Sequence, residues 1–237
     1  MRRHFVHFLW GSLLAILGLV FVFFISVWNG WVGYMPNMDE LSNPIDKFAS
    51  QVYSSDQQLI GTWNADNNNR VAIDYNGLSP HLVHALVATE DERFYEHSGI
   101  DFIALGRAVV KRGVMGQASA GGGSTITQQL AKQLFSEKAH STVERLLQKP
   151  IEWIIAVKLE RYFTKEEILA MYFNYFDFLH NAVGIKRAAN VYFNKEPRKL
   201  TVTESAMLVG LCKNPSMFNP LRHPERCLQR RNVVLMQ

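Results

Sequence analysis

An uncharged apolar run near the N-terminus constrains this chain more than any other feature of its sequence. Between residues 5 and 27 the sequence has no acidic or basic residue except His7. As a helix, this run would be about 34 Å long, slightly more than the roughly 30 Å hydrocarbon core of a bilayer. We therefore expect one transmembrane helix at the start of the chain.

The residues on either side of the run predict how it crosses the membrane. Arg2 and Arg3 precede it, and the cytoplasmic ends of membrane helices carry an excess of Lys and Arg. Trp28, Trp31 and Tyr34 follow it, as interfacial aromatic residues do, and no small-residue cleavage site is visible. We expect a single-pass anchor with a cytoplasmic N-terminus and the rest of the chain outside. A cleaved signal peptide is the alternative.

Composition limits the partners of the remaining chain. The formal charge of +4 halves when Arg2 and Arg3 are set aside, and no basic run alternates with stacking aromatic residues. We therefore expect no nucleic-acid partner. A weak basic excess beside a membrane suits anionic headgroups or lipid phosphates. Cys212 and Cys227 fit neither a zinc spacing nor a disulfide framework, so we expect no metal site and a buried free thiol at Cys212.

The pattern beyond the anchor predicts a mainly α fold with a small β appendage. Strand-like pieces at 51–54, 59–63 and 70–75 are separated by turn-favouring residues, and nearly everything beyond Ser79 has helical periodicity. The expected organisation is a cytoplasmic tip and anchor over 1–35, a linker over 36–50, and one folded domain over 51–237 with its β piece at 51–75.

Glu90 lies on the apolar face of the first helix predicted in that domain. Ser79 and Pro80 are typical of a helix start, with a hydroxyl cap and a proline at the first helical position. Glu90 falls at helical spacing among three apolar residues, Val83, Val87 and Phe94. A partly desolvated carboxylate is suited to acid or base chemistry. An ion pair with Arg93 is the alternative.

Residues 102–115 mix apolar side chains with Arg107, Lys111 and Arg112. We expect an ordinary core helix here. The alternative is a surface element that dips into the lipid headgroup layer, because the segment is both apolar and basic.

A glycine-rich loop follows at residues 120–124. Its three glycines allow the backbone to approach a ligand closely, and Thr125 with Gln128 predicts a capping box for the next helix. With Lys132 two turns into that helix, the loop suits a phosphate. A plain tight turn would explain the glycines equally well. The loop is no nucleotide P-loop, because no Gly-Lys-Ser/Thr closes it.

Glu152 is a second carboxylate on an apolar stripe, with Ile155 and Leu159 on the same face. Pro150 either kinks a long helix or starts a new one, and a new helix would place Glu152 in its first turn. An ion pair between Lys149 and Glu152 without chemistry is the alternative.

Later segments carry clear helix signals. Thr164 with Glu167, and Thr201 with Glu204, predict capping boxes. Another helix is expected over 181–193, and a last one still continues at the end of the sequence, so we expect the natural chain to go on.

These features together indicate glycosyl transfer or glycan cleavage. A hydrolase uses two acids that flank a glycosidic bond. A transferase with a lipid pyrophosphate donor needs one base and cations for the leaving group, which Lys132 and Lys149 would supply. The residues alone leave this choice open.

Five segments, in order, resemble the signatures of the peptidoglycan glycosyltransferases, family 51. This family comprises the lysozyme-like domain of class A penicillin-binding proteins and the monofunctional enzymes. The similarity runs from about Val52 to the C-terminus, and the matching segments are 90–101, 122–132, 148–152, 184–193 and 204–215.

The resemblance implies a lysozyme-like fold and polymerisation of lipid II at the outer face of the bacterial cytoplasmic membrane, with inversion. Glu90 would be the general base and Glu152 would assist near the leaving group. Asp91, Phe94 and His97 would position the base. The implied substrate-binding set is Asp91, Phe94, His97, Gly123, Ser124, Thr125, Gln128, Gln129, Lys132, Gln148 and Lys149.

The sequence departs from the family pattern at two places that are expected to contact the substrate. Gln148 stands where the family usually has arginine, and Pro150 follows, so leaving-group stabilisation would depend more on Lys149. Residues 175–181 replace a glycine-containing stretch. We expect no cofactor, with a divalent cation at the pyrophosphate as the alternative. The implied partners are lipid II, the growing lipid-linked glycan strand, the membrane and proteins of a cell-wall synthesis complex.

Three functions remain in competition at this point: a glycosyltransferase, a membrane-anchored glycan hydrolase and a non-catalytic cell-wall scaffold. No Ser-x-x-Lys signature with its partner motifs occurs in a suitable context, so we do not expect this chain to bind penicillin.

Overall fold

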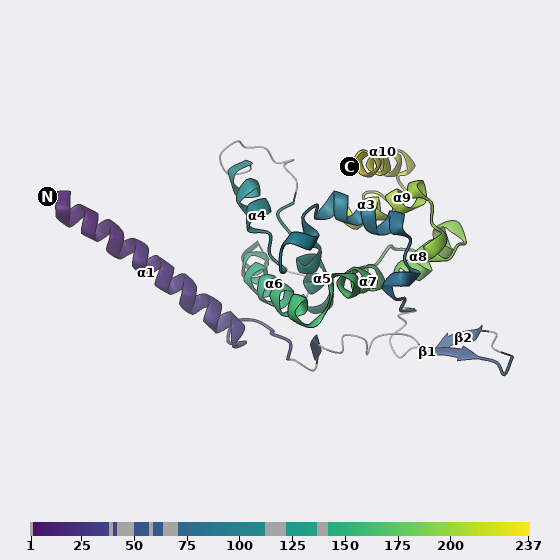
Figure 1. Cartoon of the computed structure of the whole chain (residues 1–237), viewed down its shortest axis with the longest axis horizontal. Helices are drawn as coiled ribbons and strands as arrows, with labels where there is room; N and C mark the ends of the chain where they lie inside the picture. Colours follow the sequence, from purple (N-terminus) through teal and green to yellow (C-terminus); the bar gives the residue numbers. More distant parts are fainter. Residues whose placement is uncertain are drawn as a thin grey trace.

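The computed structural model describes residues 2–37, 40–41, 50–56, 59–63, 71–111, 122–136 and 142–237. Within these residues the chain is mainly helical, as predicted (Figure 1). The elements, in order, are α1 (Arg2–Trp28), β1 (Ser50–Tyr53), β2 (Leu59–Trp63), η2 (Tyr75–Gly77), α3 (Pro80–Glu90), η3 (Phe94–Glu96), α4 (Phe102–Val109), α5 (Ile126–Phe135), α6 (Thr142–Tyr162), α7 (Lys165–Tyr175), α8 (Ile185–Phe193), η5 (Pro197–Lys199), α9 (Val202–Lys213) and α10 (Pro224–Leu235).

Helix α1 is the expected apolar helix, and Arg3–Trp28 is long and apolar enough to cross a membrane, with a mean hydropathy of 2.6. Its C-terminal end packs on α6, whereas its N-terminal part extends away from the other helices (Figure 1). Phe24 stacks on Trp153 with ring centroids 6.4 Å apart, and Lys158 Nζ lies 5.0 Å from the centre of the Trp28 ring. These contacts connect the exit of the apolar helix to the helical body.

The β piece is smaller than predicted. Strands β1 and β2 pair antiparallel, with Ser50 opposite Trp63, which confirms the first two predicted strands. The third is wrong, because residues 71–74 form no strand and η2 begins at Tyr75. Asn174 of α7 takes the place of a neighbouring strand. Its side chain accepts from Ile73 N–H at 3.2 Å and donates to Ile73 C=O at 2.9 Å.

The core lies between the helices that follow η2. Helix α5 packs on α6 and α7, α3 packs on α9, and α9 packs on α10. The helices bury apolar stripes against one another, which removes these side chains from water. Among the described residues, the largest fully buried side chains are Tyr172, Phe94, Phe173, Phe178, Leu41, Leu82, Leu86, Ile126, Leu130, Ile155, Leu159 and Ile168.

Helix α3 begins and ends differently from the prediction in two details. Ser79 occupies the N-cap position, but its hydroxyl donates to the Leu200 carbonyl at 3.0 Å and caps nothing. The helix ends at Glu90, because Asp91 leaves the helical region with φ −158° and ψ 72°. Phe94 therefore does not share the face of Glu90, although it is fully buried as part of η3.

Helix α4 is a surface helix, so the expected core helix is wrong. None of its residues is buried, and Phe102, Ile103 and Val109 are each more than 60% exposed. Helix α4 lies close to the glycine loop: a Cβ added to Gly123 would lie only 3.2 Å from Ala108 Cβ of α4. Residues 112–115 of the predicted segment lie outside the described residues.

The remaining helices confirm several local signals. Two of the three predicted capping boxes are present, at Thr164 with Glu167 and at Thr201 with Glu204. Helix α6 runs through Pro150 without a break, so Glu152 does not lie in a first turn.

Helix α8 starts at Ile185 rather than at residue 181. The reason is a left-handed stretch, since Leu179, His180 and Asn181 have φ of 66°, 53° and 57°. Gly184 follows with φ 82°, and a Cβ there would lie 2.8 Å from the Asn174 carbonyl oxygen. This close approach explains why only glycine fits at that position.

Candidate active site

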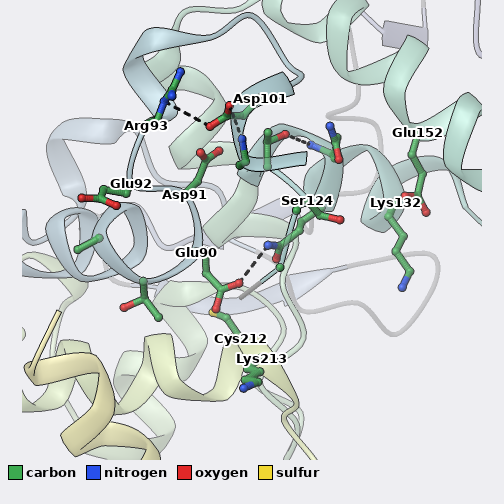
Figure 2. A pocket seen from close by; sticks show the side chains of 18 of the residues that line it. Glu90, Asp91, Glu92, Arg93, Asp101, Ser124, Lys132, Glu152, Cys212 and Lys213 are labelled. Carbon is green, nitrogen blue, oxygen red and sulfur yellow. Dashed lines mark hydrogen bonds and ion pairs between the residues drawn. The ribbon is translucent and has the colours of Figure 1, made fainter. Parts of the chain in front are cut away.

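A cavity of about 930 Å³ collects most of the residues singled out from the sequence (Figure 2). Glu90, Glu152, Lys132 and Lys149 all line it, although they come from three different helices. Asp91, Gly123, Ser124, Thr125, Gln128 and Gln129 line it as well. Phe94, His97 and Gln148 do not belong to the lining.

Glu90, the last residue of α3, is held from two sides. Gln129 Nε2 donates to Glu90 Oε2 at 3.1 Å, and an Arg230 guanidinium nitrogen lies 3.3 Å from Glu90 Oε1. The Glu90 side chain is 16% exposed, so it is largely buried and still reaches the cavity. Arg93, the partner considered from the sequence, pairs with Glu96 and Asp101 instead.

Gln129 in turn contacts the core. The Tyr172 hydroxyl donates to Gln129 Oε1 at 3.0 Å. Tyr172 is fully buried, and burial, with smaller contributions from Cys212 and Glu90, raises the pKa of its phenol well above the ordinary value. Burial and the Glu90 charge likewise raise the pKa of the Cys212 thiol, which is a free, buried cysteine as expected.

Asp91 connects the end of α3 to the start of α5. Its carboxylate lies 3.0 Å from His97 Nε2 and accepts from the Ile126 N–H at 3.0 Å. Lys165 donates to the His97 carbonyl at 2.7 Å, and its Nζ lies 4.3 Å from the centre of the Phe94 ring. Asp91, Phe94 and His97 thus form a buried framework next to Glu90 in the chain. A direct contact of these three residues with substrate remains a prediction.

Thr125 and Gln128 are tied to the loop before α4. The Gly99 carbonyl accepts from Thr125 Oγ1 at 2.8 Å and from Gln128 Nε2 at 3.1 Å. Thr125 caps Gln128 N–H at 3.1 Å, but the Gln128 side chain does not return to the cap, so only half of the predicted box forms. The backbone N–H groups of Ile126 and Gln128 already donate to protein side chains. A phosphate would therefore contact lysine side chains rather than these two N–H groups.

Lys149 and Glu152 form the ion pair that the sequence offered as an alternative. Lys149 Nζ lies 2.6 Å from Glu152 Oε2 and 3.3 Å from Ser124 Oγ. The Glu152 side chain is 3% exposed, whereas that of Lys149 is 41% exposed. The pair lies on the cavity wall, so Glu152 holds Lys149 in place while the ammonium group stays accessible.

Sequence reasoning missed further cations in the cavity wall: Arg107, Lys213 and Arg230. In the described part of the chain, the side chains of Arg107, Lys132 and Lys213 make no hydrogen bond or ion pair. These groups can therefore bind an anionic ligand without breaking an internal contact. The described residues include no group of three or more His, Cys, Asp or Glu side chains that could hold a metal ion.

Known proteins are similar to this chain in sequence. The family described as Transglycosylase matches residues 56–237. Penicillin-binding protein 1A of Aquifex aeolicus (strain VF5) is 39% identical over 226 residues, covering 94% of this chain and 30% of that protein. Penicillin-binding protein 1A of Escherichia coli (strain K12) is 39% identical over 201 residues, covering 85% and 23%. Penicillin-binding protein 1F of Bacillus subtilis (strain 168) is 43% identical over 167 residues, covering 70% and 23%. The chain spans less than a third of the length of these relatives.

Proposed function

This chain belongs to the transglycosylase family, and from that membership we propose that it is a peptidoglycan glycosyltransferase that polymerises lipid II into glycan strands. The observation that carries the proposal is the cavity itself. It places the largely buried carboxylate of Glu90 beside cations that have no partner among the described residues.

In the proposed reaction, Glu90 accepts the proton of the sugar 4-hydroxyl of lipid II, the acceptor. The hydroxyl oxygen then forms a bond to the anomeric carbon of the lipid-linked donor strand. The bond from that carbon to the pyrophosphate breaks, and its electron pair leaves with the lipid pyrophosphate. Attack opposite the leaving group inverts the configuration of the anomeric carbon.

The surroundings of Glu90 suit a base. Each carboxylate oxygen accepts one donor, from Gln129 or from Arg230, and an ionised carboxylate has further lone pairs. The two donors fix the carboxylate in place, and the remaining lone pairs can receive the hydroxyl proton.

The cations suit the other half of the reaction. Negative charge develops on the departing pyrophosphate, and fixed positive charges stabilise it in the transition state. We assign this role to Lys132, Lys149 and Arg107, with Glu152 acting near the leaving group by holding Lys149. Because Gln148 is uncharged, Lys149 takes the larger share. We propose that no cofactor is required.

The membrane-facing features fit a lipid-linked substrate. Helix α1 can cross a membrane, and α4 exposes Phe102, Ile103 and Val109 beside Arg107. Exposed apolar residues next to basic ones favour the lipid headgroup layer. We therefore propose for α4 the alternative considered from the sequence, a surface helix that dips into this layer. We propose that the N-terminus is cytoplasmic and the cavity lies at the outer face, within reach of lipid II and of other cell-wall synthesis proteins.

Polymerisation of labelled lipid II by the full chain in detergent tests this function. Wild-type protein should make long strands, and Glu90→Gln should lose about 100-fold or more in rate, the size of a general-base contribution. Glu152→Gln should lose less, because Lys149 remains. Glu225→Gln, an exposed position on α10 away from the cavity lining, is the matched control and should match wild type.

Three results would contradict the proposal. Full polymerising activity of Glu90→Gln would remove the assigned base. Cleavage of preformed glycan strands without polymer formation would instead identify a hydrolase. The absence of both polymerisation and cleavage would identify a non-catalytic scaffold.

A further inference from the structure

Three side chains form a chain of hydrogen bonds from the core to the cavity. Tyr172 of α7 donates to Gln129 Oε1 at 3.0 Å, and Gln129 Nε2 donates to Glu90 Oε2 at 3.1 Å. Glu90 and Gln129 both line the cavity, and Glu90 is the base in the reaction proposed above. Tyr172 is fully buried and does not line the cavity.

The direction of these bonds follows from the chemistry of the groups at both ends. The Gln129 amide has a donor end and an acceptor end, and a 180° rotation would exchange them. The rotated amide would turn its oxygen toward the Glu90 carboxylate, which can only accept while it is ionised. A tyrosine hydroxyl that donates to Oε1 stabilises the orientation with the NH₂ group toward Glu90.

Tyr172 is suited to hold that orientation permanently. Burial is the main cause that raises the pKa of its phenol, so the hydroxyl keeps its proton throughout the neutral range. The ring is fixed between Phe173, at 5.7 Å in edge contact, and Phe176, stacked at 6.0 Å. A buried hydrogen-bond chain of this kind also polarises the central amide, which strengthens its donation to the carboxylate.

We propose that Tyr172 is a positioning residue for the base: through Gln129 it fixes the place and direction of the Glu90 carboxylate. This inference rests on the proposed function, because it assigns Tyr172 a task in that reaction. Tyr172 touches no substrate, so its loss should lower kcat and leave KM for lipid II unchanged.

A double-mutant cycle in the full chain tests the pathway. Tyr172→Phe removes one hydroxyl at constant ring volume and should lower kcat about fivefold, the worth of one ordinary hydrogen bond. Gln129→Leu should lower it about twentyfold or more, since the carboxylate then loses its neutral donor. If Tyr172 acts through Gln129, the double variant should be no slower than Gln129→Leu alone.

Tyr192→Phe is the matched control. It also removes a hydroxyl hydrogen bond, the partly buried one to the Phe178 carbonyl at 2.7 Å, but Tyr192 does not line the cavity. Its kcat should equal that of wild type. Thermal unfolding of all variants separates loss of positioning from loss of structure.

The outcomes separate this inference from the function on which it rests. Multiplicative effects in the double variant, or an unchanged kcat for Tyr172→Phe, would overturn the positioning role while Glu90→Gln stays inactive. A wild-type chain without polymerisation, or an active Glu90→Gln variant, would overturn both.

Discussion

Gly99 is a position where the fold leaves no room for a side chain. Its φ of 90° lies in the region that favours glycine, and a Cβ there would lie 2.8 Å from Ala156 C and 2.9 Å from both Ala156 O and Val157 N. These atoms belong to the backbone of α6 and cannot rotate away. Gly99→Ala should therefore cost about 1–2 kcal/mol for the left-handed backbone and about 1–3 kcal/mol for overpacking, or roughly 2–5 kcal/mol in all.

The substitution should also disturb the candidate site. The Gly99 carbonyl holds Thr125 and Gln128 at the start of α5, so a displaced loop shifts the helix that carries Gln129 and Lys132. Urea unfolding of the full chain in detergent, followed by circular dichroism, measures the change in the free energy of unfolding. Lipid II polymerisation should fall in parallel.

Gly106 provides the matched control. It lies inside α4, and a Cβ there meets nothing within 4 Å. Gly106→Ala should be neutral or stabilise the protein by about 0.5–1 kcal/mol, because alanine has the better helix propensity. A Gly99→Ala variant that unfolds within about 0.5 kcal/mol of wild type would refute the reasoning, since neither strain nor the close contact would then exist.

Two further predictions concern acid and metal. Burial would raise the pKa of Asp101, but the Ala104 N–H, the Arg93 charge and the Ile103 N–H together lower it. A carboxyl whose pKa is lowered by folding stabilises the folded protein at pH values above its ordinary pKa near 4, and this contribution is lost as the pH falls below that value. Asp101→Asn should therefore flatten the loss of stability below about pH 4 in thermal unfolding curves. An equally steep acid transition in that variant would speak against this assignment. Polymerisation should persist in EDTA, because lysine and arginine side chains supply the positive charge; a loss that Mg²⁺ restores would assign that charge to a divalent cation.

Much of the fold was predictable from local patterns. The apolar helix, the mainly α class and two of the three predicted capping boxes were confirmed, because each depends on residues within about four positions of one another or on a continuous run. The errors have a tertiary origin. Residues 71–74 form no strand because Asn174 satisfies the Ile73 backbone, and α4 is exposed although its sequence suits a core helix equally well.

The candidate site divides in the same way. The sequence singled out Glu90, Glu152, Lys132 and Lys149, and the structure places all four on one cavity. Sequence reasoning did not assign Arg230 a partner, since it lies 140 residues from Glu90 in the chain. Periodicity describes which face of a helix is apolar, but it does not say which other helix will meet that face.

The sequence by itself determined an apolar helix long enough to cross a membrane, a helical domain and the residue types that the proposed chemistry needs. Only the tertiary structure decided how those groups are held: Glu90 between Gln129 and Arg230, and Gln129 against Tyr172. The physical reason is that local signals act through backbone hydrogen bonds within one turn. These side-chain contacts exist only after α5 packs on α7 and after α10 packs on α9 and α3.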